Sequence, residues 1–570
     1  MQTFLNARRP LYRCSVKSFI YVSLLAVVIL LLAAKGIRNE GTGSLHPDTP
    51  RYLVNGVFFY DLIRDFPLSA PIKYAQQYYA RYPALSLGHH PLLLGLAETP
   101  TYAVFGISVC SARLTIVFFM LLGGVMWFLL IRAIYDETVA FFSSLLLITT
   151  PFIVEFSQAV MSEIPAVALI IVTTYFFYRY CQFGKSKYAY AFSISLVLSV
   201  YARQQAVFMI PVFLCYFLIA KGPRKLITKE IIVSCIIIAL LLLPVVPMTL
   251  KFSQTNVRAV SEKSLSSRFE LSNVLYHVKA LWHPQLTVPA LILSLLGVGL
   301  SLYRRDKRAT IFLLWIAGNY LQATYAKAQD PRYSIYWLPV FCLFAAATID
   351  LFRYRPLKVL LSTLVIATAM YQFVSTFRVE PTFAEGYEEA ARYVIENRKG
   401  ESVLYGNSVD SGRFIFFVRK HDPQRGLIVL RADKMLADPP ASWVVGERGT
   451  GRELIYGILR DLGTGYVVIE DKEFGSPTLD LLREELKSER FVLRKRIPIR
   501  SNSSKLLDIA STTYRSKLQG LALAIYEYKE YAPPQPGKVL HMDIRLMGDS
   551  IVVPLDDLLR NRYRTTPPKQ

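Results

Sequence analysis

The chain has 570 residues, 53% of them hydrophobic, with a mean hydropathy of +0.33, and its long apolar runs recur as far as about residue 376, as is typical of a polytopic membrane protein. Of the formal net charge of +23, nearly all lies in residues 1–376, which hold 34 Lys and Arg against 15 Asp and Glu, whereas residues 377–570 hold 31 against 27. The basic residues occupy every second gap between apolar runs, so the charge follows the positive-inside rule and argues against nucleic acid as a partner.

The apolar runs predict about eleven transmembrane helices. Their spans are 18–34, 112–131, 138–154, 164–180, 188–201, 206–220, 230–250, 286–303, 309–325, 333–350 and 357–376. The first run follows basic residues, as in a signal peptide, but Lys-Gly-Ile-Arg (35–38) stands where a cleavage site of small residues would be, so we expect a retained helix. The basic clusters place the N-terminus inside, and an odd number of crossings then places the C-terminal part outside.

Three predicted outer segments are longer or more polar than a connection requires: 35–111, 251–285 and 327–333. The first interleaves aromatic and basic residues at near-helical spacing in YDLIRDF and KYAQQYYARYP, which predicts helices along the membrane interface. Trp282, Trp315 and Trp337 fall near predicted bilayer edges and favour an aromatic belt.

Beyond residue 376 the pattern changes to that of a soluble α/β unit. Amphipathic stretches at 385–397, 411–420, 451–462 and 477–487 alternate with β-type runs at 402–406, 427–430, 466–470 and 491–499, and later runs at 521–528, 538–546 and 550–555 predict added strands. The sequence therefore predicts a transmembrane catalytic domain over 1–376 and an extracytoplasmic α/β domain over 377–570.

A few acidic residues are expected at the outer membrane face, where an unpaired carboxylate is costly and is a functional candidate by default. They are Asp48, Glu98, Glu155, Glu163 and Asp330. Asp48 lies between two prolines just after the first helix, and its structural alternative is an N-cap, with Thr49 as a competing cap. Glu163 precedes a proline at a predicted helix start, where the helix dipole alone would favour it.

The outer-face cations form the complementary set: Lys73, Arg81, Arg113, Arg203 and Arg332. Arg203, in YARQQAVF, stands between two apolar runs, where an unpaired guanidinium would be expensive. Arginine binds phosphate through a bidentate fork, so a phosphate at the membrane surface is one partner; an ion pair with Glu155 or Glu163 is the alternative.

The chain carries no Walker loop, dinucleotide-binding glycine pattern or HExxH motif. His89 and His90 are adjacent, and adjacent side chains point apart on a helix or strand, so they are weak evidence for a metal. We therefore assign no metal ligands and no certain cofactor, and leave a requirement for a divalent cation open.

The order of several short motifs resembles the GT-C glycosyltransferases, and among them the family 39-like branch of lipid A aminoarabinose transferases and protein O-mannosyltransferases. These motifs are an outer Asp after the first helix, the loop GHHPLL, GISVCSARL, MSEIP, YARQQ and DPRYSIYWLPV, spread over residues 15–376.

The resemblance implies roles for particular residues. Asp48 matches the family's Asp that serves as catalytic base or orients the acceptor, so it is our candidate base, although Thr49 replaces the Glu that often follows it. Glu163 matches the family's second acidic position and is implied to supply the second catalytic carboxylate. Basic residues at positions such as Arg203 and Arg332 are implied to hold the donor phosphate, with Tyr333 completing the Arg-Tyr motif. We place Lys73 and Arg81 in the same phosphate-binding group because they are outer-face cations.

These features predict a glycosyltransferase that moves a sugar from a polyprenyl-phosphate donor to a hydroxyl of a lipid, glycan or protein acceptor, with membrane lipids around it. Such a donor carries its own leaving group, so the protein needs a base and cations but no nucleotide. The alternatives are a transporter or flippase for a lipid-linked glycan, or a membrane-anchored scaffold. A bacterial inner membrane with the C-terminal domain in the periplasm fits best, although an endoplasmic-reticulum protein with a lumenal domain would follow the same rule.

Overall fold

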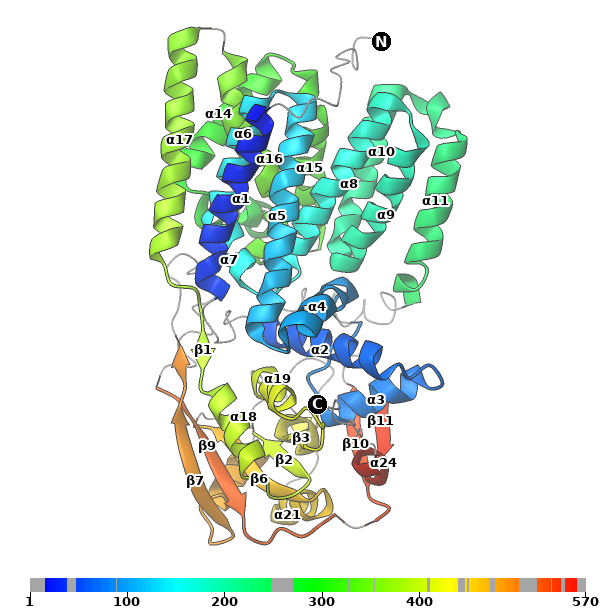
Figure 1. Ribbon diagram of the computed structural model, residues 1–570, viewed down its shortest axis with the longest axis vertical. Coiled ribbons are helices and arrows are strands. Elements are labelled where there is room, and N and C mark those ends of the chain that lie inside the picture. The colour runs from blue at the N-terminus through cyan, green and yellow to red at the C-terminus, as the bar shows by residue number, and fades with distance from the viewer. Residues whose placement is uncertain are drawn as a thin grey trace.

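The computed structural model describes residues 16–37, 48–88, 90–247, 270–326, 329–352, 354–406, 411–438, 446–447, 451–471, 477–501, 520–534, 536–544 and 549–560. A bundle of long helices forms one end of the molecule and a mixed α/β region forms the other, with α2, α3 and α4 lying between them (Figure 1). The predicted architecture, a multi-pass helical membrane protein with a C-terminal α/β region, is confirmed.

Helices occur at all eleven predicted span positions. They are α1 (Val16–Ile37), α5 (Val109–Ile134), α6 and α7 (Glu137–Thr149 and Pro151–Gln158), α8 (Glu163–Phe183), α9 (Ser186–Ala202), α10 (Met209–Lys221), α11 (Lys229–Leu242), α14 (Val288–Tyr303), α15 (Thr310–Tyr325), α16 (Leu338–Leu351) and α17 (Arg355–Arg378). Among the described residues, six helices are long and apolar enough to cross a membrane, or up to eight if each of two bent pairs is one span. The helices α9 and α11, with 17 and 14 residues, are not among these eight, because each is shorter than every one of those spans.

Local sequence explains where several of these helices begin and end. Asp136 begins α6 by accepting hydrogen bonds from the backbone N–H groups of Thr138 and Val139, at 2.8 and 2.9 Å. Pro151 has no N–H to continue α6, so it opens α7 instead, and the two helices are bent by 59°. Gly184 ends α8 with a positive φ of 65°.

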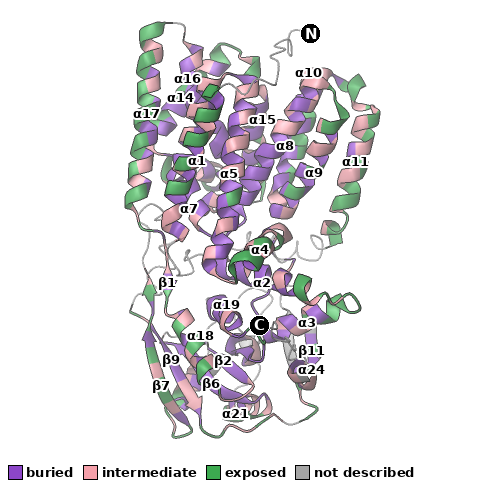
Figure 2. Cartoon of the chain, in the orientation of Figure 1, coloured by how far each residue is buried: buried purple, intermediate pink, exposed green. Residues whose placement is uncertain are grey.

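The bundle core surrounds the span Pro331–Leu351, of which 94% is buried, whereas only 28% of the α17 span is buried (Figure 2). Trp315 and Trp337 lie in this core, with 0% and 2% of their surface exposed, and the Trp337 indole donates a hydrogen bond to Gln285 Oε1 at 2.7 Å. The predicted aromatic belt is therefore wrong for these two residues, because their indoles pack between helices; Trp282 is 60% exposed.

The predicted outer segment 35–111 contains three further helices: α2 (Thr49–Asp65), α3 (Pro71–Arg81) and α4 (Leu92–Phe105). Prolines stand in the first turn of α2 and of α3, where the missing N–H is tolerated. These helices run across the end of the bundle and face the C-terminal region (Figure 1).

The C-terminal region is built on a five-stranded sheet in the order β3-β2-β6-β9-β7. Its strands are β2 (Ser402–Tyr405), β3 (Ile428–Arg431), β6 (Thr464–Glu470), β7 (Phe491–Pro498) and β9 (Ala522–Tyr528). Strand β2 pairs in parallel with β3 and β6, whereas β9 pairs antiparallel with β6 and β7. The strands β2, β3 and β6 are buried along their whole length, as in a sheet covered on both faces.

Each amphipathic stretch predicted in this region is a helix: α18 (Tyr387–Glu396), α19 (Ser411–His421), α21 (Arg452–Asp461) and α22 (Pro477–Glu485). The last two predicted strands, β10 (Val539–Ile544) and β11 (Asp549–Pro554), pair with each other as a separate hairpin. β11 and the short helix α24 (Leu555–Arg560) pack against α3, so the end of the chain contacts the segment that follows the first helix.

Candidate functional site

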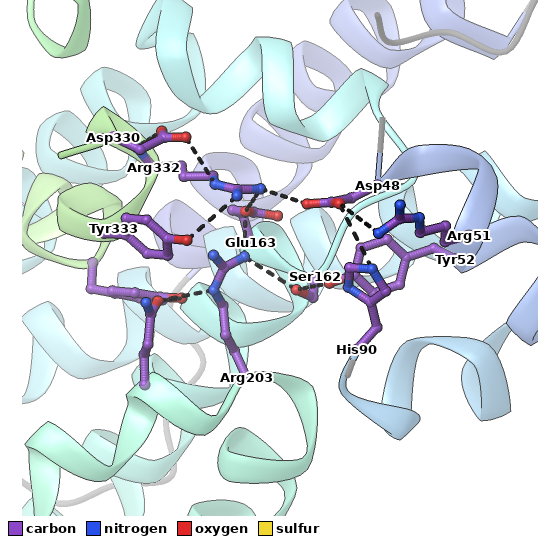
Figure 3. Close-up of polar contacts among 12 residues, drawn as sticks. Asp48, Arg51, Tyr52, His90, Ser162, Glu163, Arg203, Asp330, Arg332 and Tyr333 are labelled. Carbon is purple, nitrogen blue, oxygen red and sulfur yellow. Dashed lines mark hydrogen bonds and ion pairs between the residues drawn. The ribbon is translucent and has the colours of Figure 1, made fainter. Parts of the chain in front are cut away.

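Asp48 stands at the start of α2, but its side chain makes no capping hydrogen bond. Its Oδ2 accepts a hydrogen bond from Arg332 Nη1 at 3.0 Å, and its Oδ1 lies 3.9 Å from Arg51 Nη1 (Figure 3). The Asp48 side chain is 18% exposed. The Asp48 carboxylate thus contacts Arg332, which is distant in sequence, and remains partly open to solvent. An N-cap role explains neither feature.

Arg332 belongs to the short helix η6 (Pro331–Trp337), which precedes α16. Asp330 starts this helix by accepting from the Arg332 backbone N–H at 3.0 Å, and its other carboxylate oxygen lies 3.1 Å from Arg332 Nε. Tyr333 adds a hydroxyl 3.5 Å from Arg332 Nη2, and the guanidinium carbons of Arg203 and Arg332 lie 5.5 and 5.2 Å from the centre of its ring. The aromatic ring thus stands beside both arginines.

Glu163 and Arg203 form a buried ion pair between the start of α8 and the end of α9. The Glu163 side chain is 0% exposed, and Arg203 Nη1 donates to its Oε1. The same oxygen lies 3.9 Å from Arg332 Nη1, and Glu163 Oε2 has no hydrogen-bond partner among the described residues. Arg203 also donates to Ser162 Oγ at 3.3 Å and to Gln205 Oε1 at 3.0 Å. One of the two ion pairs considered for Arg203 is therefore present, and it is the one with Glu163.

Two contributors to the site were not identified from the sequence. His90 Nε2 lies 3.7 Å from Asp48 Oδ1, and its ring packs on that of Tyr52, whose hydroxyl is 2.8 Å from Ser162 Oγ. Burial raises the pKa of Tyr52, and the nearby Glu163 carboxylate raises it further, so the Tyr52 hydroxyl acts as a neutral hydrogen-bonding group. The sequence indicated His90 only as weak evidence for a metal and as part of the loop GHHPLL; His89 lies outside the described residues.

Lys73 and Arg81, predicted as phosphate ligands, make contacts with α24 at the end of the chain. Lys73 Nζ lies 3.0 Å from Asp557 Oδ2, and Arg81 donates to the Leu558 carbonyl oxygen. Of the predicted cations, the structure brings Arg203 and Arg332 to Asp48 and Glu163, whereas Lys73 and Arg81 join α3 to the C-terminal region.

The remaining outer-face candidates have separate surroundings. Glu98 is fully buried in α4 and accepts from the Tyr102 hydroxyl at 3.2 Å, and burial raises its pKa well above the usual range. It fills the space beside Gly56, because a Cβ there would lie 1.8 Å from Glu98 Oε2.

The other two candidates lie elsewhere. Glu155 belongs to α7. The Arg113 guanidinium donates hydrogen bonds to the carbonyl oxygens of Gly36 and Gln158.

The described residues contain no group of three or more His, Cys, Asp or Glu side chains that could hold a metal ion. The site combines two carboxylates, Asp48 and Glu163, with two guanidinium groups, Arg203 and Arg332. A carboxylate with solvent access can accept a proton, and two clustered guanidinium groups can bind a phosphate.

Comparison with known proteins gives a family match for part of the chain. Residues 89–248 match the family described as Dolichyl-phosphate-mannose-protein mannosyltransferase. This range contains Glu163 and Arg203 but ends before Arg332. No curated protein matches the sequence significantly.

Several solved structures share the fold over most of the chain. ArnT from Cupriavidus metallidurans bound to undecaprenyl phosphate is 12% identical, with a TM-score of 0.56, covering 86% of this chain and 99% of that protein. The archaeal oligosaccharyltransferase AglB from Archaeoglobus fulgidus, in complex with an inhibitory peptide and a dolichol-phosphate, is 14% identical, with a TM-score of 0.50 and coverages of 80% and 70%. The arabinofuranosyltransferase AftD from Mycobacteria is 13% identical, with a TM-score of 0.54 and coverages of 92% and 41%.

The predicted resemblance to the GT-C glycosyltransferases is confirmed at the level of the fold and, over residues 89–248, by the family match. The chain is a multi-pass membrane protein with the fold of the GT-C polyprenyl-phosphate glycosyltransferases.

Proposed function

We propose that the chain transfers a sugar from a polyprenyl-phosphate donor to an acceptor hydroxyl, with Asp48 as the base and Arg203 and Arg332 as ligands of the donor phosphate. The observation that carries the proposal is the 3.0 Å contact between Asp48 Oδ2 and Arg332 Nη1, because a carboxylate can accept a proton and a guanidinium can bind phosphate. The GT-C fold and the lipid phosphates bound to ArnT and AglB support this donor class.

In the proposed reaction, Asp48 takes the proton from the acceptor hydroxyl as its oxygen attacks the anomeric carbon of the donor sugar. The bond between that carbon and the phosphate oxygen breaks, and the bonding electrons leave with the lipid phosphate. Arg203 and Arg332 stabilise the negative charge that develops on the departing phosphate. Attack from the face opposite the phosphate inverts the configuration of the anomeric carbon.

Glu163 is better suited to holding the arginines than to accepting a proton. Its side chain is fully buried, and one oxygen is bound to Arg203 and lies 3.9 Å from Arg332. We therefore assign Glu163 as a positioning residue. Lys73 and Arg81 contact α24, so we assign the donor phosphate to Arg203, Arg332 and the Tyr333 hydroxyl.

We further propose that the site faces the outer side of the membrane. Helix α2 lies at the bundle end that adjoins the C-terminal region (Figure 1), and Asp48, at the start of α2, contacts Arg332. The basic loops favour the opposite end as the cytoplasmic one. In a bacterial inner membrane, the domain after residue 376 would then be periplasmic.

The test is transfer of labelled sugar from a set of polyprenyl-phosphate sugars into membrane lipids, glycans and proteins, using the native chain and Asp48→Asn. The native chain should transfer label, and the Asn variant should lose about 10²-fold or more of the rate while folding normally, since Asn cannot accept the proton. Asp330→Asn is the matched control, because Asp330 also contacts Arg332, at 3.1 Å, and should keep most activity.

Each outcome is informative. An Asp48→Asn variant with near-native transfer would remove Asp48 as the base. No transfer by the native chain from any donor would refute the glycosyltransferase proposal and favour a transporter or a scaffold.

A further inference from the structure

Two acidic residues near the end of α2, the buried Asp61 and the partly buried Asp65, pair with two arginines of the C-terminal region. The Asp61 side chain is 0% exposed, and Arg419 contacts it through two donors: Nη2 to Oδ1 at 2.6 Å and Nε to Oδ2 at 2.8 Å. Arg425 Nη1 lies 2.6 Å from Asp65 Oδ2 and 3.7 Å from Asp61 Oδ2. We call these four residues, Asp61, Asp65, Arg419 and Arg425, the ionic clamp.

Neighbouring side chains complete the hydrogen bonding of the clamp's acidic residues. The hydroxyl of Tyr78 donates to Asp61 Oδ2 at 2.9 Å, and that of Tyr74 donates to Asp65 Oδ2 at 2.7 Å, both from α3. The pair formed by Asp61 and Arg419 is bidentate, which fixes orientation as well as distance. Buried ion pairs add little net stability relative to apolar packing, but they define one arrangement of the groups they join.

The C-terminal region also contacts the other end of α2. Gly412, at the start of α19, lies against Pro50 so closely that a Cβ there would be 2.9 Å from Pro50 Cβ. Pro50 is two residues from Asp48. Helix α19 therefore contacts α2 at two places (Figure 1): Gly412 meets the first turn of α2, and Arg419 binds Asp61 near the end of α2.

We propose that the ionic clamp is a positioning device for transfer: the C-terminal region holds α2 so that Asp48 stays beside Arg332. This inference rests on the proposed role of Asp48. Arg203 and Arg332 are on other elements, at the end of α9 and in η6, so loosening α2 should displace the base and leave the phosphate ligands in place. A displacement of about 1 Å can cost about 10²-fold in rate.

The first arm of the test measures hydrogen exchange and does not depend on sugar transfer. Hydrogen exchange at the amides of Thr49–Asp65 is compared between the full-length native chain, Arg425→Ala and Glu388→Gln. Arg425→Ala is chosen because Asp65 keeps its bond from Tyr74 and Asp61 keeps Arg419, so the variant should fold. Glu388→Gln is the matched control: Glu388 binds Lys420 and His421 of the same helix α19, at 2.6 and 2.8 Å, from α18 within the C-terminal region.

The second arm measures transfer and binding of undecaprenyl phosphate. Arg425→Ala should lower kcat at least tenfold with donor affinity unchanged, whereas Glu388→Gln should alter neither. A more severe variant, Asp61→Asn, should show a larger loss of kcat if it folds.

The outcomes separate this inference from the proposed function. Native exchange of α2 in Arg425→Ala would refute the clamp, and so would equal acceleration in Glu388→Gln, which would indicate general loosening of the C-terminal region. Faster exchange with unchanged kcat would show that the clamp holds α2 but does not position the base. A native chain that transfers no sugar would refute the proposed function, and with it the catalytic role of the clamp, while the exchange arm would still decide whether it holds α2.

Discussion

Replacing Glu163 by glutamine tests the charge balance of the candidate site, because it keeps the shape of the side chain and removes its negative charge. The Glu163 carboxylate is fully buried, bound to Arg203 and 3.9 Å from Arg332 Nη1. At 3.9 Å and an effective dielectric constant of about 20, the attraction of Arg332 alone is about 4 kcal/mol. The interaction with Arg203 is larger, and both are offset by the cost of desolvating the carboxylate.

Breaking a buried ion pair from one side typically costs about 3–5 kcal/mol. In Glu163→Gln the loss should fall at the lower end, about 3 kcal/mol, because Arg203 keeps its hydrogen bonds to Ser162 and Gln205. At about 2 °C per kcal/mol for a large protein, the unfolding temperature should drop by about 6 °C. A phosphate that binds both arginines would replace the missing charge, so undecaprenyl phosphate should stabilise the variant more than the native chain.

The assay is thermal unfolding in detergent, followed by tryptophan fluorescence with and without undecaprenyl phosphate. Asp330→Asn serves as control: the Asp330 side chain is 27% exposed, so losing its pair with Arg332 should cost at most about 1 kcal/mol. An unchanged unfolding temperature for Glu163→Gln would refute the view that its charge balances the arginines. A larger stabilisation of the native chain by the lipid phosphate would refute the assignment of those arginines as phosphate ligands.

Three further predictions follow from single contacts. Arg203→Ala should weaken binding of undecaprenyl phosphate by about tenfold or more, as measured by titration, because one charge-assisted phosphate contact is lost; unchanged affinity would exclude this role. Burial disfavours the charged form of Glu388, but hydrogen bonds from His421 and Lys420 outweigh it and lower its pKa to about 2. Because the folded-state pKa is below the unfolded value of about 4.3, this pair stabilises the protein at neutral pH, and the contribution is lost as the pH falls from about 5 towards 2. After allowance for solvent screening it is about 1 kcal/mol, so the stability difference between the native chain and Glu388→Gln should vanish in acid; a constant difference would contradict the assignment. Gly297→Ala should destabilise the bundle, since a Cβ there would lie 1.9 Å from the Phe344 carbonyl oxygen, whereas Gly299→Ala meets nothing within 4 Å and should be neutral or stabilising in the same unfolding assay.

Patterns that are local in sequence predicted the helices and strands. An apolar run long enough to span a membrane identifies a helix, and helices stand at all eleven predicted span positions. A short β-branched run flanked by turn residues identifies a strand, and strands stand at all seven predicted positions. The pairing of strands was not predictable in this way. The insertion of β9 between β6 and β7, and the docking of β11 on α3, depend on contacts between distant segments, which no local pattern encodes.

Charge at a costly position gave a wide set of candidates, and the order of the motifs narrowed it. Asp48, Glu163, Arg203 and Arg332 were selected from that set because of the resemblance to the GT-C glycosyltransferases, and the structure places these four together. Charge alone did not predict that Lys73 and Arg81 contact α24 whereas Arg203 and Arg332 lie beside Asp48 and Glu163, since all four cations have the same sign and a similar sequence setting. His90 was missed as a neighbour of Asp48 because a histidine at a loop edge carries no periodic signal.

The salt bridge between Asp48 and Arg332 has a consequence for the order in which substrates bind under the proposed function. A donor phosphate that engages Arg332 competes with Asp48 for the same guanidinium, so arrival of the lipid releases Asp48 Oδ2 from Arg332 and leaves that oxygen open to the acceptor hydroxyl. Before the donor arrives, Oδ2 of Asp48 is bound to Arg332. Under the proposed function, the chain without donor would thereby be protected against activating an acceptor or water with no sugar to receive it, and kinetics with the donor binding first are the expected pattern.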